Sequence, residues 1–308
     1  MEFRVLTEPQ EGATYGDLLA LARVSEAAGY DGFSRSDHLM AIVSSGLPGP
    51  TEAWTTLAGL ARDTTRLRLG TLVSPVTFRL PGPLAVQVAQ VHEMSGGRVE
   101  LGLGAGWYAG EHTAWGIPFP GVRERFDRLE EQLAIITGLW ATPADRTFSF
   151  SGRHHALRDC PGLAHPVLPP PPIVVGGGGR RRTPQLAARY AGEFNVNFAS
   201  VEETGAQFAR VRDACVAIGR PVGEIAFSTA QTVCVGRDAA EVARRAAAVP
   251  PLPYPWRERG LVGSPAEVVD RLGRWAQVGV DRVYLQVVDL GDLDQLELFA
   301  ADVVPQTR

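Results

Sequence analysis

A histidine and a carboxylate stand side by side directly after a short apolar run at residues 32–34. Ser36, Asp37 and His38 therefore fall where a strand would end. A neutral imidazole accepts or donates a proton near neutral pH, and an adjacent carboxylate can fix its orientation. Two interpretations follow from this spacing: His38 oriented by Asp37 forms a catalytic acid–base pair, or Asp37 caps the chain beside a half-buried histidine.

Two glycine-rich segments also follow apolar runs. Residues 102–106 precede Trp107 and Tyr108, and glycine there would let a flat ring or a backbone approach closely. The two aromatic side chains either wall a pocket or take part in ordinary loop packing. Residues 176–179 are all glycine and precede an arginine triplet. Successive glycine amides before a helix favour an anion such as phosphate, although a flexible turn with a solvated basic cap has the same sequence.

Motifs that the sequence lacks exclude several kinds of enzyme. A GxGxxG fingerprint, a serine nucleophile elbow, an HExxH zinc motif and a P-loop are all absent. All 30 basic residues are arginine, so no lysine can form a Schiff base, which excludes lysine-dependent aldolase and pyridoxal-phosphate chemistry. His154, His155 and His165 lie near one another, but no ligand spacing supports a metal site, and none is expected.

The composition is that of a folded globular protein. Apolar residues make up 45% and charged residues 21% of the 308 positions, and the net charge is −4. This balance argues against a nucleic-acid partner held by a broad basic surface, and no apolar run has the length of a membrane span. Three isolated cysteines and an N-terminus without a signal-peptide pattern predict a cytoplasmic protein.

Short apolar runs alternate with longer amphipathic ones, and this alternation predicts the elements that position these residues. The expected strands are residues 3–6, 32–34, 67–73, 99–103, 173–175, 194–197, 225–235 and 282–288. Nearly continuous apolar strands, each followed by a helical pattern, are typical of a parallel sheet buried on both faces. Eight such units favour a (β/α)8 TIM barrel over a doubly wound open sheet. Function in a barrel lies at the C-terminal strand ends, where the segments above fall.

The alternation breaks in two places. Residues 141–172, with a hairpin tip expected at residues 148–152 and a proline run, are expected to form an insertion after the fourth β/α unit. Residues 250–263 are proline-rich and are expected to form a surface loop. Because the alternation resumes after each break, residues 1–308 are expected to form a single domain.

Further segments complete a pattern that resembles a known family. They are residues 69–79, 94–98, 101–107, 116–120, 125–131 and 172–179, together with Glu111. Jointly they resemble the luciferase-like monooxygenase superfamily, and most closely its F420-dependent oxidoreductase branch. The motifs are clear over residues 3–200, and the remainder of the chain matches by its pattern of elements.

The resemblance implies a TIM barrel with a reduced deazaflavin, coenzyme F420, across its C-terminal mouth. It also implies a non-prolyl cis peptide bond between Leu72 and Val73 behind the ring, and it places His38 near the ring and the substrate. With the residues already described, the expected cofactor-binding set is Ser36, Leu72, Val73, Gly104, Ala105, Gly106, Trp107, Gly176, Gly177, Gly178, Gly179 and Arg180.

The activity that the resemblance implies is hydride transfer between reduced F420 and a C=C, C=N or C=O bond of a small organic substrate. His38 is then the proton donor or acceptor. The glucose-6-phosphate dehydrogenases of the superfamily have Glu at the position that matches Trp107, so this chain is expected to be a reductase with a different site. One alternative is an FMNH2-dependent monooxygenase that uses oxygen, and another is a protein that binds flavin or deazaflavin without turnover. Relatives are commonly dimers, so a homodimer is also implied.

Overall fold

The computed structural model describes residues 1–165 and 167–307, in which eight parallel strands close into a barrel. Their order is β1-β2-β3-β5-β8-β9-β10-β12, and β12 pairs with β1 to complete the ring. The barrel strands are β1 (Glu2–Thr7), β2 (Gly32–Arg35), β3 (Arg68–Thr71), β5 (Val99–Gly104), β8 (Ile173–Gly176), β9 (Glu193–Asn197), β10 (Ala226–Val235) and β12 (Arg282–Val287). The closed order confirms the predicted TIM barrel and excludes the open sheet.

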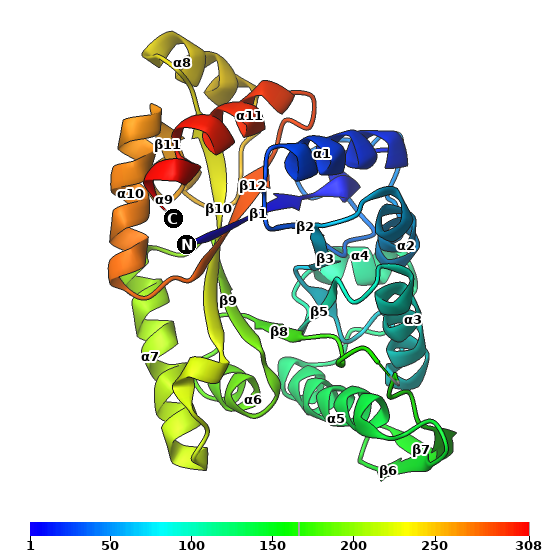
Figure 1. Cartoon of the computed structure of the whole chain (residues 1–308). Helices are drawn as coiled ribbons and strands as arrows, with labels where there is room; N and C mark the ends of the chain where they lie inside the picture. The colour runs from blue at the N-terminus through cyan, green and yellow to red at the C-terminus, as the bar shows by residue number, and fades with distance from the viewer. Residues whose placement is uncertain (166, 308) are drawn as a thin grey trace.

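Helices surround the strands as a ring (Figure 1). The helices of the repeating units are α1 (Tyr15–Ala27), α2 (Ala53–Asp63), α3 (Pro81–Met94), α5 (Val122–Ala141), α6 (Arg182–Tyr190), α7 (Val201–Ile218), α10 (Pro265–Gln277) and α11 (Leu293–Asp302). Between them lie α4 (Ala109–Ala114), α8 (Ala239–Ala248), α9 (Trp256–Arg259), β4 (Ser74–Pro75) and β11 (Leu261–Gly263). Local signals begin several of these helices: at α7, Ser200 and Glu203 form a reciprocal capping box.

Two expected segments differ in detail from the structure. The strand expected at residues 67–73 ends at Thr71, and the chain resumes as β4, in which Ser74 pairs with Leu103 of β5. The peptide bond between Leu72 and Val73 is cis, which interrupts the strand there and confirms the expectation from the resemblance. Residues 250–263 are only partly a loop, since they contain α9 and β11.

The insertion follows α5, after the fourth β/α unit as predicted, and forms an antiparallel hairpin of β6 (Thr147–Ser151) and β7 (Ala156–Pro161). It projects beyond α5 at the lower right of Figure 1. The hairpin tip expected at residues 148–152 is wrong by several residues, because that segment is mostly strand. The turn lies at residues 152–155, where the Glu131 carboxylate accepts the backbone N–H groups of Arg153, His154 and His155.

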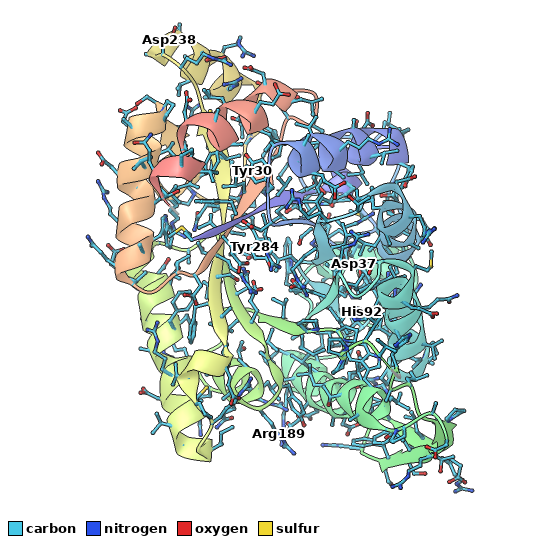
Figure 2. The ribbon with its side chains drawn as sticks, in the orientation of Figure 1. Tyr30, Asp37, His92, Arg189, Asp238 and Tyr284 are labelled. Atoms are coloured by element: carbon cyan, nitrogen blue, oxygen red, sulfur yellow. The ribbon has the colours of Figure 1, made fainter. Side chains whose placement is uncertain are left out.

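Opposite charges fill the N-terminal half of the barrel interior. The Arg4 guanidinium donates to the Glu100 carboxylate and, at 3.1 Å, to the Tyr284 hydroxyl. Tyr284 lies near the middle of the barrel (Figure 2) and donates to Glu193 at 2.8 Å. Burial alone would raise the pKa of Glu100, but the charges of Arg4 and Arg68 lower it to about 2. A buried network with every charge paired closes this end of the barrel.

An apolar layer separates this network from the opposite end of the barrel. It consists of Leu6, Leu72, Val174, Ala230 and the ring of Tyr284, with Val73 and Phe198 packed against it. The layer makes the interior a packed core rather than a channel, so a ligand can enter only from the C-terminal face.

The buried network predicts that Glu100→Gln lowers the free energy of unfolding by about 3 kcal/mol, because it leaves the buried Arg4 and the partly exposed Arg68 without their shared carboxylate. Urea denaturation monitored by circular dichroism measures this change. The matched control is Glu224→Gln, which removes an exposed ion pair with Arg220 and should cost less than about 1 kcal/mol. Equal losses in the two variants would contradict the assignment of Glu100 as a structural charge.

Candidate active site

A cavity of about 1100 Å³ opens at the C-terminal end of the barrel. It exceeds the range of about 300–1,000 Å³ usual for small-molecule sites, so a large cofactor and a substrate fit together. Segments that directly follow β1, β2, β3, β5, β8, β9 and β12 supply its walls. The expected site residues that line it are Ser36, His38, Leu72, Val73, Gly104, Ala105, Gly106, Trp107, Gly176, Gly177, Gly178, Gly179 and Arg180.

The side chain of Val73 explains two of these glycines. A Cβ on Gly104 would lie 2.8 Å from Val73 Cγ2, and a Cβ on Gly176 would lie 3.1 Å from Val73 Cγ1. Both distances are shorter than the contacts of about 3.5–4.0 Å that carbon atoms prefer. The glycines therefore leave the surface around Leu72 and Val73 without projecting neighbours, and a flat ring can approach it.

The turn between β8 and α6 presents amides that point to no acceptor. In residues 1–165 and 167–307, the backbone N–H groups of Gly178 and Gly179 make no hydrogen bond, and no side chain caps α6. Gln207 of α7 donates to the Gly178 carbonyl and holds the turn from its other side. Free amides before a helix fit a phosphate group. We call this turn, residues 177–179, the glycine cradle.

Two arginines of the triplet after the cradle, Arg180 and Arg182, point to different surroundings. Arg180 lines the cavity, as does Arg210 of α7 at the same end. Arg182 faces α5, where its guanidinium pairs with Asp127 at 2.6 Å and with Glu130 at 3.1 Å. Arg180 and Arg210 form no ion pair within the described chain, so their charges remain available to an anion.

His38 has a carboxylate partner from a distant part of the chain. Its Nδ1 lies 2.9 Å from Oε1 of Glu111, which is buried and lies 73 residues away in α4. The second oxygen of Glu111 accepts the backbone N–H of Leu39 at 3.0 Å, which fixes the carboxylate. Burial lowers the pKa of His38, but the hydrogen bond and charge of Glu111, with the charges of Glu8 and Asp37, outweigh burial and raise it.

The expectation that Asp37 orients His38 is wrong. The buried Asp37 carboxylate accepts the Ser74 hydroxyl at 2.5 Å and the Arg79 guanidinium at 2.5 and 3.1 Å, below the cavity. Backbone direction explains the error, because adjacent residues in extended chain point to opposite sides. Asp37 therefore ties β2 to β4, and it affects His38 only through its charge.

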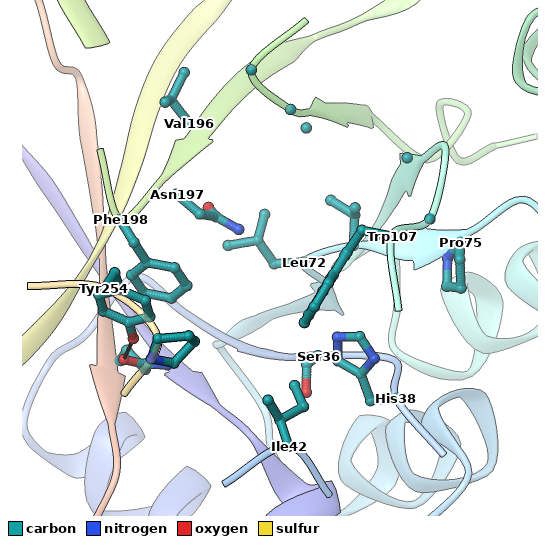
Figure 3. Close-up of a pocket in the computed structure, with 18 of the residues that line it drawn as sticks. Ser36, His38, Ile42, Leu72, Pro75, Trp107, Val196, Asn197, Phe198 and Tyr254 are labelled. Carbon is teal, nitrogen blue, oxygen red and sulfur yellow. Dashed lines mark hydrogen bonds between the residues drawn. The ribbon is translucent and has the colours of Figure 1, made fainter. Parts of the chain in front are cut away.

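A chain of hydrogen bonds begins at Ser36, which lies beside His38 (Figure 3), and runs along the cavity wall. Ser36 donates to Gln10 at 2.6 Å, and Gln10 donates to Glu8 at 2.7 Å. Gln286, at the end of β12, donates to the other Glu8 oxygen at 3.2 Å and accepts the Tyr254 hydroxyl at 2.7 Å. Glu8 thus faces the cavity from a polar wall, and its hydrogen-bond partners in the described residues are neutral amides.

Several cavity residues received no role from the sequence. They are Glu8, Gln10, Glu111, Asn197, Phe198, Gln207, Arg210, Tyr254 and Gln286. Glu8 and Phe198 directly follow strands, which is a usable signal in a barrel. Glu111 belongs to the positions that carry the family resemblance, although no role was expected for it. Gln207 and Tyr254 reach the cavity from a helix and a loop, and no local pattern marks them.

Residues 1–165 and 167–307 bring no three His, Cys, Asp or Glu side chains together in a way that could hold a metal ion. His154 lies 3.8 Å from Glu124 and 3.9 Å from Asp127, on the outside of α5. In the same residues, no helix combines the length and the apolar character needed to cross a membrane.

The His38–Glu111 pair predicts that Glu111→Gln lowers the pKa of His38, because burial then acts without its main opposing cause. NMR titration of the histidine ring carbons, assigned with His38→Asn, measures the midpoint. Glu203→Gln changes a carboxylate on α7 that does not touch His38 and should leave the midpoint in place. An unchanged midpoint in Glu111→Gln would refute the pairing.

Since the folded-state pKa of His38 lies above 6.5, its pairing with Glu111 stabilises the fold below about pH 6.5. This contribution is lost as the pH rises through the raised pKa.

Curated relatives match about half of the chain. An F420-dependent glucose-6-phosphate dehydrogenase from Beutenbergia cavernae is 35% identical over 154 residues, which are 50% of this chain and 44% of the relative. The pyrimidine monooxygenase RutA from Escherichia coli is 31% identical over 192 residues, which are 58% of this chain and 48% of the relative. The chain thus spans about half the length of the curated relatives that it matches.

The fold and the family are shown by matches over a longer part of the chain. A solved F420-dependent secondary alcohol dehydrogenase, in complex with an F420-acetone adduct, superposes with a TM-score of 0.84 over 100% of this chain and 99% of that one. At 18% identity this likeness shows the fold. The family model described as luciferase-like monooxygenase matches residues 1–260, so the chain belongs to the luciferase-like monooxygenase family.

Proposed function

We propose that this chain is an F420-dependent oxidoreductase that reduces a C=C, C=N or C=O bond of a small organic substrate by hydride transfer. One observation carries the proposal: a single cavity joins the glycine cradle, the flat surface of Leu72 and Val73, and His38. A cofactor with a tricyclic ring and a ribityl phosphate needs the first two, and a reduction needs a proton donor beside the ring. The dehydrogenase among the relatives supports the same cofactor.

The chain's own residues account for the proton that the reaction needs. When bound, reduced F420 supplies a hydride, which carries two electrons, to an electrophilic carbon. Glu111 occupies Nδ1 of His38, so Nε2 is left to donate a proton to the neighbouring atom of the double bond. With one hydride and one proton added, the double bond would become a single bond, and His38 would recover a proton from solvent.

The charges beside the glycine cradle favour F420 over FMN. F420 carries an acidic lactyl-oligoglutamate tail beyond its phosphate, whereas FMN ends at the phosphate. Arg180 and Arg210 lie at the cradle end and form no ion pair in the described residues, so they can receive such a tail. An FMNH2-dependent monooxygenase remains the second candidate, because one relative is a pyrimidine monooxygenase and FMN also needs a phosphate cradle. Binding without turnover is the third.

Other expectations stay predictions. The replacement of Glu by Trp at position 107 supports reduction of an unsaturated bond over oxidation of a sugar alcohol. We also propose that residues 1–308 form a single domain and that the protein is a cytoplasmic homodimer.

Fluorescence titration with F420 and with FMN at equal salt tests the cofactor. We expect F420 to bind with a Kd of about 1 μM or tighter, and FMN to bind more weakly. The double variant Arg180→Gln/Arg210→Gln should weaken F420 binding by about tenfold and FMN binding by less, since the tail loses its partners. Arg181→Gln, an exposed neighbour outside the cavity, is the matched control. Tighter binding of FMN would refute the F420 assignment.

Replacement of His38 tests the proton donor. His38→Asn should lower kcat by about 10²–10⁴, the usual contribution of a general acid, and should change the Kd of F420 little. Stopped-flow oxidation of reduced F420 under anaerobic conditions measures the rate with any substrate that the parent accepts. Full activity in His38→Asn would remove His38 from the mechanism. A parent that binds F420 and reduces no unsaturated acceptor would support the non-catalytic alternative.

A further inference from the structure

The charged side chains that line the cavity are unevenly distributed around the barrel mouth: three carboxylates lie on the β1 side, whereas Glu203 of α7 shares the opposite side with the cavity arginines. β1 and β8 are separated by three strands in either direction around the ring, so they lie opposite each other. The segment after β1 contributes the carboxylates Glu8, Glu11 and Asp17. The cavity arginines, Arg180 and Arg210, come from the segment after β8 and from α7. The glycine cradle belongs to the basic side, so the acidic side is left to the substrate.

Glu8 on the acidic side forms no ion pair in the described residues, although its charge acts on His38 and on the buried Arg35. No guanidinium of the described residues lies within 4.0 Å of Glu8, whose oxygens accept only the amides of Gln10 and Gln286. Glu11 accepts the backbone N–H groups of Ile42 and Ser44, and so holds the loop that lines the cavity there. An anionic group on a substrate would face these charges across a cavity with apolar walls, where screening is weak.

Two pairs of aromatic side chains flank the space above Leu72, and Figure 3 shows Trp107 on one side and Phe198 with Tyr254 on the other. On one side, Trp107 is 61% exposed and stacks on Tyr108, with ring centroids 5.3 Å apart. On the other side, Phe198 and Tyr254 stack with centroids 4.3 Å apart and planes within 7°. Flat side chains on both sides of an open cavity suit a flat ligand, because stacking rewards a planar partner.

Phe198 is held in an unusual conformation that directs its ring. Its φ is +54°, in the left-handed region that bulky residues seldom adopt. Its backbone N–H donates to the Ala230 carbonyl at 2.9 Å, and its carbonyl accepts Arg259 at 3.0 Å. Such outliers persist where the surroundings enforce them and are frequent at ligand sites. The Phe198–Tyr254 wall is therefore built into the fold.

Neutral side chains at the edge of this space offer hydrogen bonds. Burial raises the pKa of Tyr254 to about 12, so its hydroxyl is neutral at physiological pH. The amides of Asn197 and Gln286 lie beside it on the same side of the cavity. The chain contains no lysine, and both cavity arginines lie on the cradle side.

We infer that the substrate is an uncharged, planar, unsaturated molecule with an aryl or similarly flat apolar group, and that sugar phosphates and other anions are excluded. The flat group lies between Trp107 and the Phe198–Tyr254 wall, on the side of the cofactor ring that faces away from Leu72 and Val73. The acidic side repels negative charge. This inference rests on the proposed function for the reaction, and on the cavity alone for the shape and charge of the ligand.

A pair of probes, one uncharged and one with an added carboxylate group, tests the inference. The probes are benzylideneacetone and its para-carboxylate, and their Kd values are measured by tryptophan fluorescence with the apo-protein and with the protein loaded with oxidised F420. We expect the uncharged ketone to bind at least about tenfold more tightly than the carboxylate. Glu8→Gln should reduce this ratio to about threefold or less, whereas Glu224→Gln on the surface should leave it unchanged.

A second series tests the aromatic wall. Trp107→Ala should raise the Kd of benzylideneacetone by about tenfold and that of cyclohexenone, which lacks the aryl group, by less than about twofold. Trp115→Phe is the control, because Trp115 is exposed but lies outside the cavity lining. Reduction of both ketones with reduced F420 gives kcat/KM values, which should follow the same order.

The outcomes separate this inference from the proposed function. If the carboxylate or glucose-6-phosphate binds as tightly as the uncharged ketone, or if no ketone binds to the F420-loaded protein, the inference is overturned although F420 binds. If F420 fails to bind while the apo-protein still prefers the uncharged ketone, the proposed function is overturned and the inference stands. If Trp107→Ala leaves the Kd of benzylideneacetone unchanged, the aromatic wall is refuted.

Discussion

Eight parallel strands close on themselves, and this closure brings every residue that follows a strand to one mouth. His38 after β2, the Leu72–Val73 bond after β3, Gly104 within β5 and the glycine cradle after β8 are distant in the chain, yet they line one cavity. The same closure forces strand backbones together, so that Gly104 and Gly176 must lack a Cβ where Val73 fills the space. Each feature of the site depends on the barrel, and a change in strand order would separate them.

The interior of the barrel keeps the two ends of the molecule apart. The N-terminal half is filled by the paired charges of Arg4, Glu100 and Glu193, and the apolar layer above it includes Leu72. A fully paired buried network is rigid, because any displacement leaves a charge without a partner at a large cost. The floor of the cavity is therefore supported from below, and the groups above it can hold fixed positions toward a ligand.

The sequence predicted what depends on local patterns and missed what depends on distant contacts. Apolar runs located all eight barrel strands, and the glycines after β8 predicted an anion site at the end of a barrel strand. The role predicted for Asp37 was wrong because its carboxylate binds Arg79, which lies 42 residues away in the chain. The actual partner of His38 is Glu111, which lies 73 residues away. Neither pairing has a sequence signal. The separation of charge across the mouth was also hidden, since it appears only when β1 and β8 are known to lie opposite each other.

The charges around the cavity act on both the substrate and the proton donor His38. Glu111, Glu8 and Asp37 all raise the pKa of His38 and so favour its protonated form. Glu8 contributes to both effects, because it lies on the acidic side of the mouth and its charge raises the pKa of His38. A dehydrogenase that removes a proton from an alcohol needs the opposite bias, a histidine that is neutral before reaction. The raised pKa of His38 thus supports its proposed role as the proton donor in a reduction.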